Sequence, residues 1–304
     1  MKGYLRLFLT GFGMGSADIV PGVSGGTIAF IFGIYEELVF SIKKLSGETL
    51  KLFIKGHPLA AYKGIPFRFL VPLGAGILTA LLSLANLVTY LLNTFPELVW
   101  AFFFGLIVAS ILVVRKRVVT WDNHDIAAFL AAALGAFVLA GLVPVETPAT
   151  AAAFFTSGFI AIIAMILPGI SGSFLLVLMG KYEQILLAVV SRDVVTLGLV
   201  GIGAAVGISV FSRILSWLFE KHHDIAVATL TGFMVGSLRK VWPWKADMEL
   251  GRFLLTLALA VLGAFLLTRL ARLQALREQT ADISEPEFAR EHKIALSSQK
   301  KSKL

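Results

Sequence analysis

The sequence has no cysteine and few charged residues. Charged residues make up 15% of its 304 positions and hydrophobic residues 57%, whereas soluble domains contain about 25% and about 45–50%. A soluble protein this apolar would have too little polar surface to cover itself, so we expect lipid to be its main solvent. The absence of cysteine excludes disulfides, thiolate metal sites and cysteine nucleophiles.

Motifs for ATP-driven or enzymatic chemistry are also missing. The chain has no Walker A sequence, which argues against an ATP-driven pump. Its five histidines fall in predicted loops or the tail and show no metal-ligand spacing. These absences argue against a histidine-based phosphatase or hydrolase, and we expect no metal and no cofactor.

The formal charge of +8 is concentrated in a few clusters. These clusters lie at the N-terminus, at 43–68, at 115–117 and beyond Arg269, and all flank apolar stretches. Basic clusters beside apolar segments are typical of the cytoplasmic ends of membrane spans. They favour a membrane protein and no nucleic-acid partner.

Six stretches are long enough, or nearly so, to cross about 30 Å of hydrocarbon as helices. They are 70–92, 97–114, 126–143, 195–219, 224–238 and 252–270. Two more apolar regions, 8–42 and 151–190, are interrupted near their middle by Pro-Gly. Their length and breaks predict re-entrant hairpins, whose exposed backbone must be buried in protein or line a polar cavity. Pairs of full-span helices are the alternative.

The chain repeats itself internally, which predicts a duplication. The matches separated by 147 residues are Gly11-Phe12 with Gly158-Phe159, Pro21-Gly22 with Pro168-Gly169, Ser24-Gly25 with Ser171-Gly172, and Gly33, Tyr35 and Glu36 with Gly180, Tyr182 and Glu183. Farther on, Gly74, Gly76, Gly105 and Ser110 match Gly201, Gly203, Gly232 and Ser237 at an offset of 127. The first half is longer because of its lysine-rich linker near 43–68.

We therefore expect an all-α polytopic membrane protein with two membrane repeats, 1–145 and 146–270, followed by a cytoplasmic tail, 271–304. Each repeat is predicted to hold one re-entrant hairpin and three transmembrane helices. An odd number of spans per repeat inverts the second copy, an arrangement common in secondary transporters. The basic segments then lie inside, except 239–252, whose four basic residues would be external.

The two Pro-Gly breaks are the strongest candidates for a binding site. The backbone amides exposed where a half-helix begins, together with its dipole, can bind an anion. The candidate ligands are Ser24, Gly25, Gly26 and Thr27 at the first tip and Ser171, Gly172 and Ser173 at the second. The alternative is that these small residues only allow close helix packing. We prefer that packing role for Gly33, Gly180 and the glycine pairs 74/76 and 201/203.

Ionisable residues inside apolar segments are a second group of candidates, because they are costly there. Arg213 is a candidate phosphate ligand, although it could instead extend to the interface. Asp18, three residues before the first Pro-Gly, is a candidate coupling-ion site or a partner of the tip backbone. Glu36 and Glu183 are further coupling-ion candidates or interfacial residues. Asp18 corresponds to Met165 in the second half, so its role is not duplicated.

Two segments resemble the bacterial polyprenyl-phosphate transporter family of the PopT type. They are GMGSADIVPGVSGGTIAFIFGIYEELV and ILPGISGSFLLVLMGKYEQIL, and the resemblance covers about 3–270. It implies a flippase that moves undecaprenyl phosphate from the outer to the cytoplasmic leaflet for recycling in cell-envelope synthesis. It also implies a multi-pass protein of the bacterial cytoplasmic (inner) membrane, and we expect both termini in the cytoplasm.

The partners expected are then undecaprenyl phosphate or a similar polyprenyl phosphate, membrane lipid, and a coupling proton or sodium ion. A secondary transporter or channel for a small anion or ion is the main alternative, because it would use the same broken helices. A membrane enzyme acting on lipid phosphate is a second alternative, weakened by the lack of a catalytic histidine within a span.

Overall fold

The computed structural model describes residues 2–20 and 23–283, and in these ranges the regular structure is entirely helical. The helices are α1 (Lys2–Asp18), α2 (Gly25–Ile31), α3 (Tyr35–Lys44), α4 (Leu50–Ile54), α5 (Pro58–Gly64), α6 (Phe67–Thr94), α7 (Pro96–Val114), α8 (Asn123–Ala140), α9 (Ala151–Ile166), α10 (Gly172–Leu178), α11 (Tyr182–Ser191), α12 (Val194–Lys221), α13 (His223–Ser237) and α14 (Leu250–Ile283). A π-helix, Leu45–Thr49, precedes α4, and a 3₁₀ turn, Arg115–Arg117, follows α7. The predicted all-α class is confirmed.

Five helices in the described residues are long and apolar enough to cross a membrane: α6, α7, α8, α12 and α14. The protein is therefore a multi-pass membrane protein. The sixth predicted span, 224–238, is wrong as a full crossing, because α13 has 15 residues and a crossing needs about 20. Most of α13 is buried, so protein rather than lipid surrounds it.

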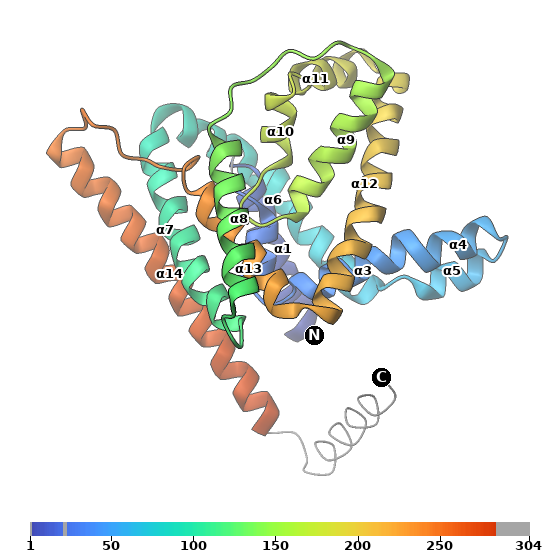
Figure 1. The fold of residues 1–304 in the computed structure, drawn as a ribbon, viewed down its shortest axis with the longest axis horizontal. Coiled ribbons are helices and arrows are strands. Elements are labelled where there is room, and N and C mark those ends of the chain that lie inside the picture. The colour runs from blue at the N-terminus through green and yellow to red at the C-terminus, as the bar shows by residue number, and fades with distance from the viewer. Residues whose placement is uncertain (1, 21–22, 284–304) are drawn as a thin grey trace.

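Helices from the two halves exchange partners. Within each half the first long helix of the hairpin packs on the next long helix, α1 on α6 and α9 on α12. Between halves, α7 packs along α14 and α8 along α13, and Figure 1 shows both pairs side by side. The second and third long helices of each repeat therefore pack against helices of the other repeat.

Repeat-related glycines set the closest of these contacts. A Cβ at Gly76 would collide with the carbonyl oxygen of Phe8, and one at Gly203 with that of Phe155, the residue that repeats Phe8. The predicted packing role is thus confirmed for Gly76 and Gly203. It is wrong for Gly74 and Gly201, where an added Cβ would meet nothing within 4 Å.

Gly33 and Gly180 allow turns instead of close helix packing, which corrects the expectation for both. Their φ angles are 71° and 64°, in the left-handed region that glycine adopts without a Cβ penalty. At these turns the chain bends by 116° between α2 and the helix from Tyr35, and by 103° between α10 and α11. α3 and α11 are consequently separate helices that leave the hairpins at a steep angle.

The loops are segregated to two sides of the molecule (Figure 1). The N-terminal end, the turn at 115–122 and the end of α14 lie on one side, and the connections 141–150 and 238–249 lie on the other. α1 and α9 start from opposite sides, as inverted repeats would, although the inversion itself stays a prediction. The predicted boundary between 270 and 271 falls inside α14, and the rest of the predicted tail, 284–304, lies outside the described residues.

Candidate functional site

Both hairpins are broken where the repeated Pro-Gly pattern occurs. α9 ends at Ile166 and α10 begins at Gly172, with Gly169 between them at a φ of 88°. In the first half the break falls between Asp18 and Gly25, but Pro21 and Gly22 themselves lie outside the described residues. The two breaks define a first tip, residues 19–27, and a second tip, residues 167–173.

Three hydrogen bonds join the two halves at the tips and directly beside them. Ser24 Oγ donates to the carbonyl oxygen of Met165 (3.3 Å), and Tyr35 Oη donates to that of Ile166 (3.0 Å). The amide of Gly169 donates to Thr27 Oγ1 (3.0 Å). First-half side chains therefore satisfy backbone groups that the second break leaves without helical partners, as buried backbone requires.

The start of α2 is already occupied by a carboxylate of the same chain. The amide of Gly25 donates to Asp18 Oδ1 (2.6 Å), and that of Gly26 donates to Ser24 Oγ (3.1 Å). The hydroxyls of Ser24 and Thr27 are engaged with the second tip. The first tip was predicted to bind an anion with the second, but the Asp18 carboxyl group already accepts from its backbone.

The second tip is arranged differently and borders a small cavity. Ser171 is buried, and its hydroxyl pairs with that of Ser173 (2.7 Å). Three parts of the chain line the cavity: the second tip and the start of α10, the end of α13 with the residues after it, and α8. The lining residues are Gly169, Ile170, Ser171, Phe174, Ser237, Lys240, Ala136, Leu139 and Ala140. The lining of this cavity thus includes a serine, a lysine and residues of both halves.

Lys240 supplies the positive charge of this cavity and was not predicted as a site residue. Its ammonium group lies 4.3 Å from the centre of the Phe174 ring, a cation–π distance. Its neighbour Val241 is buried against Val20 and Val23 of the first tip. The segment after α13 thus reaches both tips.

The other basic residues of 239–252 also have specific contacts. Lys245 and Arg252 both pair with Glu97 (3.1 and 3.5 Å). Arg239 donates to the carbonyl oxygen of Phe137 (3.0 Å) and stacks on that ring. The poor fit of this segment to the positive-inside rule was the sequence signal for Lys240, but linear sequence could not place it beside Ser171.

Three predicted site residues, Arg213, Glu183 and Glu36, are not brought to the tips. Arg213 donates to the carbonyl oxygen of Ser46 (3.4 Å), in the π-helix. Glu183, at the start of α11, is exposed. None of the three takes part in the hydrogen bonds that join the tips.

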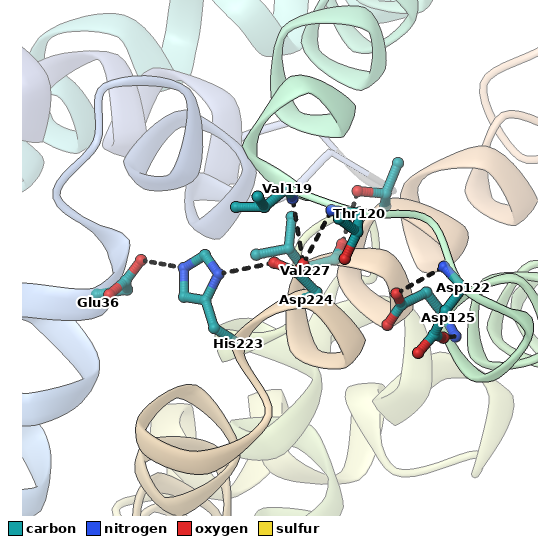
Figure 2. A network of polar contacts seen from close by, with 9 residues as sticks. Glu36, Val119, Thr120, Asp122, Asp125, His223, Asp224 and Val227 are labelled. Carbon is teal, nitrogen blue, oxygen red and sulfur yellow. Dashed lines mark hydrogen bonds and ion pairs between the residues drawn. The ribbon is translucent and has the colours of Figure 1, made fainter.

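Glu36 belongs to a polar network away from the tips (Figure 2). His223 lies between Glu36 and Asp224, with nitrogen–oxygen distances of 3.2 and 3.4 Å. Asp224 Oδ2 accepts from the amides of Val119 and Thr120 (3.2 Å each). The network joins α3, the α12–α13 junction and the turn after α7, on the side of the molecule that holds 115–122 (Figures 1 and 2).

The beginning of α8 lies next to this network and has hydrogen bonds of its own (Figure 2). Asp122 accepts from the backbone amides of Asp125 and His124, and Asp125 accepts from the amide of Asp122. These backbone hydrogen bonds, that of Asp125 above all, hold the pKa of Asp122 below its usual range. This capping box fixes where the helix starts.

A model of the undecaprenyl phosphate translocase-like family matches residues 14–274. The chain belongs to this family. Both tips, the cavity and the polar network lie within the matched range, and the resemblance found in the sequence is confirmed.

Two relatives of this family are similar over most of their length. The polyprenyl-phosphate transporter of Vibrio cholerae is 42% identical over 246 residues, 81% of this chain and 80% of the relative. The polyprenyl-phosphate transporter of Staphylococcus aureus is 31% identical over 290 residues, 89% of this chain and 97% of the relative. No solved structure matches the chain.

Proposed function

We propose that the protein is a flippase that moves undecaprenyl phosphate, or a similar polyprenyl phosphate, from the outer to the cytoplasmic leaflet. The observation that supports this most is the small cavity at the second tip, whose lining includes Ser171, Ser237 and Lys240. The names of the two relatives give the class of substrate.

The physical problem in this reaction is the phosphate and not the polyprenyl tail. An anionic headgroup cannot enter hydrocarbon unaided, because burying an unpaired charge costs many kcal/mol. Lys240 would neutralise part of that charge, and the hydroxyls of Ser171 and Ser173, with the amide of Gly172, would donate hydrogen bonds. The tail can remain in lipid, since the long helices expose apolar side chains such as Leu82 and Leu130.

The first tip has a supporting role in this proposal. It is held against the second tip by Ser24, Gly25, Gly26 and Thr27. Movement of one hairpin would therefore displace the other. Asp18 is the coupling residue, because its carboxylate occupies the start of α2 and can release it on taking up a proton. Arg213 and Glu183 are left out of the site.

The conformation described suits loading from the outer leaflet. Lys240 and Arg239 belong to the side of 238–249, which the predicted topology places outside, although the basic residues of this segment do not fit the positive-inside rule. On the opposite side, the Glu36–His223–Asp224 network ties together helices from both halves. Opening that network while the outer side closes would carry the headgroup across.

Transfer of polyprenyl phosphate in proteoliposomes tests the proposal. The lipid is placed in one leaflet, and its appearance in the other is followed with a headgroup reagent that cannot cross. We expect faster transfer than in protein-free vesicles and in vesicles holding an unrelated membrane protein. Equal rates, or uptake of inorganic phosphate without movement of the lipid, would favour the small-anion transporter instead.

A further inference from the structure

The first half contains a helical hairpin that the second half lacks. The chain passes from α3 to α6 through residues 45–66, whereas only Arg192 and Asp193 separate α11 from α12. Residues 45–66 hold the π-helix Leu45–Thr49 and the short helices α4 and α5. This hairpin, which we call the α4–α5 hairpin, accounts for the greater length of the first repeat and takes no part in the site above.

The α4–α5 hairpin extends away from the bundle (Figure 1). It runs across the direction of α12 rather than along it, as a helix lying in a membrane surface would. Two contacts hold its base to α12: Lys43 with Glu220 (2.9 Å) and Arg213 with the carbonyl of Ser46 (3.4 Å). These contacts give Arg213 a positioning role that its sequence context did not suggest.

The exposed side chains of the hairpin are of two kinds. Phe53, Leu59 and Tyr62 are 65%, 73% and 65% exposed, so most of their apolar surface has no partner within the chain. Lys51, Lys55 and Lys63, which alternate with these residues along the chain, are also exposed. Glu48 is the single acidic residue from 43 to 68. Large apolar side chains interleaved with lysines are the composition of helices that lie in the headgroup region of a bilayer.

We infer that the α4–α5 hairpin binds the surface of an anionic bilayer, in the leaflet on the side of the N-terminus. Phe53, Leu59 and Tyr62 enter the boundary between headgroups and acyl chains, and the three lysines contact anionic headgroups. The lysines favour an anionic surface over a neutral one, because a neutral surface would interact favourably with the apolar side chains alone. Each lysine near such a surface favours the bound position by about fivefold.

The absence of cysteine makes this inference directly measurable. Single nitroxide labels are placed at Phe53→Cys and Tyr62→Cys in the full-length protein, in vesicles of phosphatidylcholine with and without phosphatidylglycerol. Two reference positions bracket the scale: Leu82→Cys on the lipid-facing surface of α6 and Val119→Cys in an exposed turn, which are 86% and 84% exposed. Accessibility to oxygen and to a water-soluble nickel complex gives the depth of each label.

We expect the hairpin labels to read between Val119→Cys and Leu82→Cys when phosphatidylglycerol is present, clearly deeper than the aqueous reference. Replacing Lys51, Lys55 and Lys63 together with glutamine should shift the Tyr62→Cys label toward the aqueous reading, whereas Lys116→Gln should not. The Leu82→Cys label in the same background reports whether the variant is folded.

Two results would overturn the inference. One is an aqueous reading at both hairpin positions even when phosphatidylglycerol is present. The other is spin–spin broadening between labels, which would show that a second copy of the chain covers the hairpin. Neither result bears on the transfer of polyprenyl phosphate, so the inference and the proposed function can fail separately.

Discussion

At the scale of single residues, the two hairpin tips share a sequence pattern but differ in their partners. Asp18 fills the start of the first half-helix, while Ser171 and Ser173 of the second bond each other beside a cavity. Met165 stands where a second aspartate would be. Under the proposed function, this difference assigns anion binding to the second tip and proton exchange to Asp18 at the first.

Replacing Lys240 with glutamine should weaken transport of polyprenyl phosphate. A hydrogen bond to a charged group contributes about 1.5–3 kcal/mol, so we expect the apparent affinity to fall roughly tenfold or more. Lys245→Gln is the matched control, because Lys245 lies in the same segment but pairs with Glu97. Equal loss in both variants would assign the effect to the charge of the segment rather than to the cavity.

Replacing Asp18 with asparagine should uncouple transport from a proton gradient. The side chain keeps its size and can still accept from the amide of Gly25, but it can no longer take up a proton. Transfer by the native protein should speed up under a proton gradient, and transfer by the variant should not respond. An unchanged response in Asp18→Asn would remove Asp18 from the coupling mechanism.

Thr27→Val should destabilise the protein by removing the acceptor of the Gly169 amide. A buried amide without a partner costs about 1–3 kcal/mol. Thr79→Val is the control, since the Thr79 hydroxyl is exposed and bonds only a carbonyl of its own helix. Thermal unfolding in detergent should show a lower midpoint for Thr27→Val alone, and equal midpoints would contradict the tip contact.

At the scale of helices, hydropathy predicted most of the long elements, because span length and apolar content leave few alternatives. The breaks at 166–172 and near 18–25 were also predictable, since proline followed by glycine strongly disfavours a continuous helix. The α4–α5 hairpin and the shortness of α13 were not. Hydropathy does not separate a helix packed in protein from one packed in lipid, and a lysine-rich linker gives no periodic signal.

The glycine pairs offer a test at this scale. Gly203→Ala should force α12 away from α9, because its Cβ would meet the Phe155 carbonyl, at a cost of about 1–3 kcal/mol. Gly201→Ala fills open space and should instead stabilise the helix by about 0.4–1 kcal/mol. Unfolding midpoints of the two variants should move in opposite directions, and a similar shift in both would contradict the packing described.

At the scale of the whole molecule, the halves are joined by exchanged helices and by their tips. The repeat predicted two similar tips, but it could not predict that α7 packs with α14 and α8 with α13, because offsets carry no information about partners. Nor could it place Lys240, which reaches the second tip only when 238–241 folds back between the halves.

The central claim is that the phosphate is bound at the second tip, and a density map of the protein with bound polyprenyl phosphate tests it most directly. We predict headgroup density in the cavity, with phosphate oxygens at about 2.7–3.2 Å from Ser171 Oγ and Lys240 Nζ. Headgroup density elsewhere, for example beside Arg213 and Ser46, with the cavity empty, would contradict the account.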